Sequence, residues 1–311
     1  MNHPIRYAVI GTGAIGGFYG GLLALAGEEV HFLLHSDYDQ VRQHGLHIQS
    51  ELLGPLQLRN VRAWQRAEDM PPCDVVLVCL KSTLNQHLLP SLLPPLLHPA
   101  TVVVLIQNGL GVEEDVARLF PGLALAGGVA LIAATKTGPG HIHHLEHGNL
   151  DIGNFNAPDP SRLEPVVAAF ARAGIPSALT PDLHALRWRK LVWNIAFNGL
   201  SVLLNTTTDR LVQEPYGYAF SRELMLEVIA GAQACGVPLP SSFADDMLQF
   251  TRAMRPYAPS MKLDFDHHRP LEIKYIYETP VARARAAGYY MSKVDLVAQL
   301  LRFRESENIR G

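Results

Sequence analysis

The sequence has little cysteine and little charge, and both shortages limit the classes of protein to which it can belong. Only three cysteines, Cys73, Cys79 and Cys235, occur in 311 residues. So sparse and odd a set argues against a disulfide framework and indicates a reducing compartment. Charged residues make up 18% of the chain and the formal net charge is −3, so the overall basic footprint of a nucleic-acid-binding protein is absent. We therefore expect no nucleic-acid partner.

Long apolar runs are also missing. The longest nearly apolar run, residues 123–134, is too short and too interrupted by glycine to span a bilayer. The first residues, MNHPIRYAVIGTG, lack the charged and apolar regions of a signal peptide. We expect a cytoplasmic protein without a membrane partner.

The first half of the chain alternates short apolar runs with helical stretches. Residues 7–10, 30–34, 75–80 and 102–106 are rich in Val, Ile and Leu, as are strands that a parallel sheet buries on both faces. A helix is predicted over residues 18–26, and Gly27 follows it as a typical C-terminal residue. This order predicts a doubly wound α/β domain over residues 1–180.

The second half has a different character. Helical spacing covers residues 186–204, 221–235, 243–254 and 271–287, and Pro or Gly residues separate these stretches. At 311 residues, the chain is long enough for two domains. We therefore predict an all-helical domain over residues 181–311.

A glycine-rich motif follows the first predicted strand and precedes the first predicted helix. It matches G-x-G-x-x-G and consists of Gly11, Thr12, Gly13, Ala14, Ile15 and Gly16. In this context the first glycine permits the tight turn, the second allows a pyrophosphate to approach, and the third allows close helix packing. The motif predicts a dinucleotide site, and a glycine-rich turn without a ligand is the alternative.

The end of the second predicted strand decides which dinucleotide is expected. NAD enzymes place Asp or Glu there for the ribose hydroxyls, but this chain has His35 and Ser36, and Asp37 comes later. The missing carboxylate favours NADP over NAD. No arginine occupies the position, so His35 and Ser36 would hold the 2′-phosphate, helped by Arg42, unless His35 is simply a surface residue.

Two further polar residues follow predicted strands. Lys81 comes directly after the strand at residues 75–80, and Asn108 follows the strand at residues 102–106. Ligands of open α/β sheets bind outside the carboxyl ends of the strands. We expect both residues to line the crevice that holds the glycine motif, although a loop lysine is often only solvated.

One helix of the second half carries a polar stripe. Lys190, Asn194 and Asn198 lie at i, i+4 and i+8, and apolar residues fill nearly all other positions. A lysine in such surroundings has a lowered pKa suited to proton transfer. The alternative is a lysine paired to a carboxylate, with the asparagines satisfied in the core. Spacing alone does not distinguish Glu272 from an ordinary helix-start acid, or Ser260 from a capping serine.

The stretch from His141 to His147 contains four histidines. It has no recognised zinc spacing, and neither CxxC nor HExxH occurs. We predict a polar hairpin there and no metal.

The motifs together carry a resemblance to a known family. They are GTGAIG, CLKS, QNGLG, WRKLVWNIAFN, PSMKLD and LEIKYIYETPVARARAAG, in this order through nearly the whole chain. The sequence resembles the ketopantoate reductases (2-dehydropantoate 2-reductases). The lysine–asparagine helix and the late glutamate motif are the most specific parts.

The resemblance implies a Rossmann domain followed by a helical domain, and NADPH-dependent reduction of a 2-oxo acid in pantothenate and coenzyme A biosynthesis. Lys190 matches the general acid, and Glu272 matches a glutamate that holds lysine, substrate and cofactor. The implied substrate-binding residues are Asn108, Asn194, Asn198 and Ser260, and the implied cofactor-binding residues include Lys81, Asn108, Ala134 and Glu272. His35 replaces an arginine common in the family.

Three matters stay open at this point. A paralogue that reduces another 2-oxo acid or an imine would share these motifs. A dinucleotide sensor without activity would need only the glycine motif. A homodimer is neither predicted nor excluded by the sequence.

Overall fold

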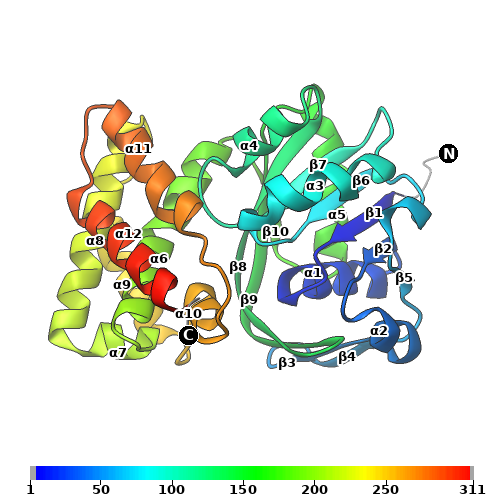
Figure 1. Cartoon of the computed structure of the whole chain (residues 1–311), viewed down its shortest axis with the longest axis horizontal. Coiled ribbons are helices and arrows are strands. Elements are labelled where there is room, and N and C mark those ends of the chain that lie inside the picture. Colours follow the sequence, from blue (N-terminus) through cyan, green and yellow to red (C-terminus); the bar gives the residue numbers. More distant parts are fainter. Residues whose placement is uncertain (1–4, 309–311) are drawn as a thin grey trace. The chain divides into compact units, whose positions relative to one another are not determined.

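The computed structural model describes residues 5–308, which divide into two compact units (Figure 1). Unit 1 contains the described residues up to Gln107 together with Val112–Leu183. Unit 2 contains Asn108–Gly111 and the described residues from His184 onward. The short segment Asn108–Gly111 therefore belongs to the second unit, although the sequence placed it in the first domain.

Unit 1 is built on a mixed sheet of ten strands among the described residues. Its strands are β1 (Arg6–Ile10), β2 (Glu29–Leu33), β3 (Leu46–Ser50), β4 (Gly54–Leu58), β5 (Arg62–Trp64), β6 (Val75–Val78), β7 (Val102–Ile106), β8 (Ala124–Gly138), β9 (His141–Asn154) and β10 (Ser177–Thr180). The order is β4-β3-β9-β8-β7-β6-β1-β2-β5, and β10 pairs with β9. Because β7, β6, β1, β2 and β5 are parallel neighbours, their carboxyl ends meet at one edge.

All four predicted strands are confirmed as β1, β2, β6 and β7, and their side chains are buried almost throughout. The predicted hairpin is also confirmed, because β8 and β9 run antiparallel on either side of a turn at Gly140. Their length was not predicted. Glycines interrupt the apolar run at residues 123–134, so a strand as long as β8 was not expected. In the structure Gly128 packs against Ile106 and Leu150, and the strand continues through it.

Helices accompany the sheet in unit 1. They are α1 (Ala14–Leu25), α2 (Tyr38–His44), α3 (Asn85–Leu92), α4 (Val112–Leu119) and α5 (Glu164–Arg172), with 3-10 turns η1 (Ala67–Asp69), η2 (Ser82–Leu84), η3 (Pro94–Leu96) and η4 (Pro160–Leu163). The helix predicted at residues 18–26 is α1, which begins four residues earlier, inside the glycine motif. An added Cβ at Gly20 would lie 2.7 Å from Phe32, so this glycine lets α1 lie close to β2.

The regular elements of unit 2 among its described residues are all helices. Its elements are α6 (Leu183–Leu203), α7 (Thr208–Gln213), α8 (Pro215–Ala234), α9 (Ser242–Ala253), α10 (Ser260–Asp266), the π-helix η5 (Lys274–Glu278), α11 (Thr279–Ala286) and α12 (Ser292–Asn308). The four predicted helices are confirmed. Pro215, one of the residues expected to separate the predicted stretches, follows α7 and is the first residue of α8, where proline is often found. The predicted helix at residues 271–287 contains η5 before α11.

The helix α6 is the centre of the core of unit 2. Trp188, Ile195 and Phe197 are fully buried in one cluster with residues from α8, α9, α11 and α12. None of the helices between residues 5 and 308 combines the length and the apolar character that a membrane span requires.

Candidate functional site

The glycine motif of unit 1 makes a tight turn between β1 and α1. Gly11 has φ = +91°, and a Cβ there would lie 2.6 Å from the backbone nitrogen of Leu80. A Cβ on Gly16 would lie 2.3 Å from the carbonyl oxygen of Gly11. Both positions therefore require glycine for the fold itself. The Thr12 hydroxyl donates to the Leu33 carbonyl at 3.1 Å and joins the turn to the end of β2.

Gly13 differs from its neighbours because its Cβ position faces open space. No heavy atom lies within 4 Å of that position. Gly13 is also the N-cap of α1, where no side chain accepts from the first N–H groups and the first turn carries no acid. Uncapped N–H groups at a helix N-terminus attract phosphate. This turn therefore fits a dinucleotide diphosphate, with Gly13 as the point of close approach.

The loop after β2 holds the residues expected at the adenosine ribose. His35 and Ser36 are exposed, whereas Asp37 is only 4% exposed. Oδ1 of Asp37 accepts from Lys136 Nζ at 2.6 Å and from Ser36 Oγ at 3.1 Å, and Oδ2 accepts from the Gly140 amide at 3.0 Å. Burial alone would raise the pKa of Asp37, but these hydrogen bonds outweigh it and lower the pKa. The first carboxylate after β2 is thus engaged within the protein.

The loop after β6 contains Lys81, which is half-buried and precedes η2. The side-chain amides of Asn85 and Gln107 pair through two hydrogen bonds of 2.9 and 2.8 Å, and Gln107 also donates to the Leu80 carbonyl at 2.7 Å. This arrangement fixes the backbone just before Lys81. Ala134 lies half-buried in β8, opposite His144.

In unit 2, the segment with Asn108 is attached to the π-helix. Gly109 has φ = +98°, and its Cβ position is 2.5 Å from Cβ of Tyr275, so no side chain fits there. The Leu110 amide donates to the Tyr275 carbonyl at 2.8 Å. Asn108 is therefore held by the chain segment that follows Glu272, and not by the sheet from which it emerges.

The polar stripe of α6 is present as predicted from its spacing. Asn194 and Asn198 are 3% and 1% exposed, and Lys190 is half-buried. Loss of solvation by burial lowers the pKa of Lys190 to about 8. Near neutral pH this lysine carries a proton that it gives up more readily than an exposed lysine does.

The two asparagines are not fully satisfied inside the protein. Nδ2 of Asn194 and Oδ1 of Asn198 are buried, and no hydrogen-bond partner for either lies among residues 5–308. Such an orphan costs about 1–3 kcal/mol, so one donor and one acceptor are left for a ligand. The alternative of asparagines satisfied in the core is thereby weakened.

Sequence reasoning missed two members of this stripe. Arg187 and Ser201 lie three residues before Lys190 and three after Asn198, on the same side of α6 by helical geometry. Both are buried, and the Ser201 hydroxyl lacks a partner among the described residues. Extending the i, i+3, i+4 series in both directions would have found them.

The remaining site residues lie on short elements of unit 2. Glu272 is 4% exposed, and its carbonyl accepts from the amide of Ile276 at 3.2 Å as η5 begins. Tyr277 of η5 donates its hydroxyl to the Ile195 carbonyl of α6 at 3.0 Å, so the glutamate segment is joined to the lysine helix. Ser260 is half-buried and opens α10. Single-turn π-helices occur frequently at functional sites.

The histidine-rich strand does not assemble a metal centre. In β9, His143 contacts Glu51 at 3.0 Å, His144 contacts Ser50 at 2.8 Å, and the His141 ring stacks on that of His47. Across the described part of the chain, no three His, Cys, Asp or Glu side chains are placed to hold a metal ion.

The predicted site residues thus fall into two groups. Unit 1 holds the residues expected to contact the dinucleotide: Gly11, Thr12, Gly13, Ala14, Ile15, Gly16, His35, Ser36, Lys81 and Ala134. Unit 2 holds those expected to act on the substrate: Asn108, Lys190, Asn194, Asn198, Ser260 and Glu272.

Comparison with known proteins gives matches along nearly the whole chain. The family described as "Ketopantoate reductase PanE/ApbA" matches residues 7–157, and "Ketopantoate reductase PanE/ApbA C terminal" matches residues 182–305. A 2-dehydropantoate 2-reductase from a Nostoc species is 43% identical, over 98% of this chain and 97% of that protein. The crystal structure of 2-dehydropantoate 2-reductase from Geobacter metallireducens is 41% identical, with a TM-score of 0.91, over 96% and 99% of the two chains.

A more distant structure shares the fold. The ternary structure of D-mandelate dehydrogenase with NADH and anilino(oxo)acetate is 19% identical, with a TM-score of 0.88, over 98% of this chain and 99% of that one. At this identity the likeness concerns the fold alone.

Proposed function

The chain belongs to the ketopantoate reductase family, and we propose that it reduces 2-dehydropantoate to pantoate with NADPH as the hydride donor. It is accordingly an oxidoreductase. The observation that carries the mechanism is the buried polar stripe of α6, where a lysine of lowered pKa accompanies two asparagines with unused hydrogen-bonding atoms.

Lys190 acts as the general acid. NADPH, when bound, supplies a hydride to the ketone carbon of the substrate. As negative charge develops on the ketone oxygen, the Lys190 ammonium group donates a proton from Nζ to that oxygen. Its pKa of about 8 keeps it protonated at neutral pH and makes the transfer easier than from an ordinary lysine.

Asn194 and Asn198 bind the substrate. Nδ2 of Asn194 is a donor and Oδ1 of Asn198 is an acceptor, and both atoms are buried without a partner among the described residues. A substrate with carboxylate and ketone oxygens and a hydroxyl group complements this pair. By family resemblance, Asn108 and Ser260 complete the substrate contacts, and Glu272 positions Lys190, substrate and cofactor.

Unit 1 binds the cofactor, through Gly13 and the N-terminus of α1 at the diphosphate. Lys81 and Ala134 contribute on the cofactor side by family resemblance. Asp37 supports NADPH over NADH, because its carboxylate is already engaged by Lys136, Ser36 and Gly140 and neither binds the ribose hydroxyls nor repels a 2′-phosphate. His35 and Ser36 then accommodate that phosphate.

The test is the loss of nicotinamide absorbance with 2-dehydropantoate, measured in parallel with NADPH and NADH. Saturable oxidation of NADPH, with a higher kcat/KM than for NADH, is the expected result. A preference for NADH would refute the cofactor assignment and leave the reduction intact. A folded protein that turns over other 2-oxo acids but not 2-dehydropantoate would refute the substrate.

A further inference from the structure

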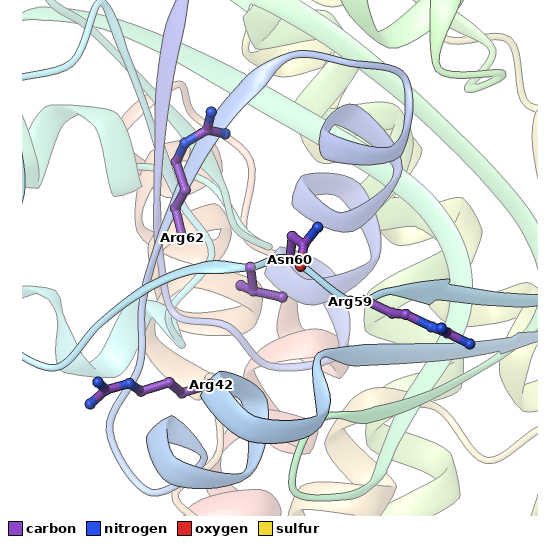
Figure 2. A pocket seen from close by; sticks show the side chains of 5 residues that line it. Arg42, Arg59, Asn60 and Arg62 are labelled. Carbon is purple, nitrogen blue, oxygen red and sulfur yellow. The ribbon is translucent and has the colours of Figure 1, made fainter.

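A pocket on unit 1 is lined by three arginines, one of which, Arg42, was expected from the sequence to help hold the 2′-phosphate of the cofactor. Its lining residues are Arg42, Arg59, Asn60, Val61 and Arg62, and its volume is ≈ 500 Å³. Arg42 comes from α2, whereas the others follow β4 and lead into β5 (Figure 2). Two segments that are separate in the sequence therefore build one open basic pocket. Its arginines are exposed, and none of its lining residues is acidic.

The three guanidinium groups have no carboxylate partner among residues 5–308. Other arginines of the protein do: Arg6 pairs with Glu29 and Arg302 with Glu278. In the pocket, Arg42 donates to the Tyr38 hydroxyl at 3.3 Å and Arg59 donates to Oε1 of Gln57 at 3.2 Å. Each arginine has five N–H donors, so most of these donors remain available to an anion.

The guanidinium groups spread around the pocket instead of converging on one point. Figure 2 shows the side chains of Arg42, Arg59 and Arg62 extending in different directions around Asn60. The arrangement suits an anion that carries two or more phosphate groups, because arginine binds phosphate through paired N–H donors.

The pocket lies away from the glycine motif along the strands. Arg62 is the first residue of β5 and pairs with His31 of β2, whereas the glycine motif follows the carboxyl end of β1. Ile10 of β1 pairs with Leu33 of β2, and Leu33 pairs with Trp64 of β5. Gly11 therefore lies at the height of the residue after Trp64, which is three residues beyond Arg62. At roughly 3.3 Å per residue this is about 10 Å along the strand direction.

We propose that Arg42, Arg59, Asn60 and Arg62 form a second anion site, which binds a free ligand with at least two phosphate groups. A phosphate could reach these arginines from two sources, the free ligand or the 2′-phosphate of the cofactor. His35, where the 2′-phosphate is expected, lies four positions beyond His31, the register partner of Arg62, and this separation along the strand direction favours the free ligand.

The experiment measures binding of inorganic pyrophosphate to the full chain by calorimetry, with and without saturating NADPH. The test variant is Arg59→Ala with Arg62→Gln. The control is Arg66→Ala, which removes an exposed arginine outside the pocket. Circular dichroism checks that each variant is folded, and the KM for NADPH is measured for all three proteins.

The proposal predicts that pyrophosphate binds the unmodified chain with and without NADPH and binds more tightly than inorganic phosphate does. The double variant should lose about tenfold or more in affinity, since it removes two guanidinium groups that can form charge-assisted hydrogen bonds with phosphate. Arg66→Ala should bind normally, and the KM for NADPH should stay unchanged in every variant.

Two results would overturn the proposal. The first is the absence of pyrophosphate binding to the unmodified chain, or equal binding by the double variant. The second is displacement of pyrophosphate by NADPH together with a raised KM for NADPH in the double variant, which would assign the arginines to the cofactor. Neither result depends on which 2-oxo acid the enzyme reduces.

Discussion

The candidate ligand sites of the two units are built by different physical means. In unit 1 the site consists of backbone groups: the uncapped N-terminus of α1, and Gly13, whose Cβ direction faces open space. Unit 2 offers side chains from one buried helix, namely a dehydrated lysine and two partly unsatisfied asparagines. The first kind of site adds little strain, whereas the second leaves polar groups buried at a cost.

This difference shows where each unit should be sensitive to substitution. A change in the glycine turn should act on cofactor affinity through shape. A change on α6 should act on chemistry and substrate binding, because in the proposed function those side chains supply charge, a proton and hydrogen bonds. The predictions below separate the two units on this basis, from the largest expected effect to the smallest.

Removing the lysine should have the largest effect. Lys190→Ala should lower kcat by about two to four powers of ten, the range of general acid catalysis, and leave NADPH affinity unchanged. Steady-state kinetics and cofactor titration measure the two quantities. Arg189→Lys, at the preceding position of α6, is the matched control and should keep its activity. A kcat for Lys190→Ala within threefold of the unmodified enzyme would exclude this role.

Removing an asparagine should affect substrate binding. Asn198→Ala should raise the KM for 2-dehydropantoate by about 10- to 100-fold, since a buried hydrogen bond to a charged ligand contributes about 1.5–3 kcal/mol. The KM for NADPH should not change. If both KM values rose together, the proposed division between the two units would fail.

The rate of reduction should depend on pH through Lys190. Because burial lowers the pKa of Lys190 to about 8, the amino group is protonated below pH 8 and loses its proton above it. The kcat/KM for reduction should therefore be flat well below pH 8, fall to about half of that plateau at pH 8 and fall to about a tenth of it at pH 9. A profile that stays flat up to pH 10 would contradict the assignment.

Filling the open space at the glycine turn should have the smallest effect. In Gly13→Ala the new methyl group meets no protein atom, so the thermal midpoint should stay within about 1 °C. It would occupy the path of the diphosphate, and the KM for NADPH should rise about fivefold, or roughly 1 kcal/mol. Gly16→Ala is the contrasting variant, since its methyl would clash with the Gly11 carbonyl and should destabilise unit 1. A fall in thermal midpoint for Gly13→Ala as large as that for Gly16→Ala would refute the role of open space.

Features set by local sequence could be predicted. The apolar runs gave β1, β2, β6 and β7, the glycine spacing gave the turn into α1, and the i, i+4, i+8 stripe gave the buried face of α6. Each depends on periodicity or on a backbone conformation that only glycine adopts readily.

Features set by contacts between distant residues could not be predicted. Asn108 belongs to unit 2 because Gly109 packs against Tyr275, which lies 166 positions later in the sequence. Asp37 is occupied because Lys136 and Gly140 reach it from the hairpin of β8 and β9. The arginine pocket likewise combines α2 with the start of β5. No local pattern marks these partners.

The central claim is that Lys190 delivers the proton from unit 2 to a substrate reduced by the cofactor of unit 1. The most direct test is rescue of Lys190→Ala by primary amines in the assay, with Asn198→Ala as the comparison. The account predicts that ethylammonium restores kcat of Lys190→Ala in a concentration-dependent manner and leaves Asn198→Ala unchanged. Equal responses of the two variants to the amine, or none in Lys190→Ala, would contradict it.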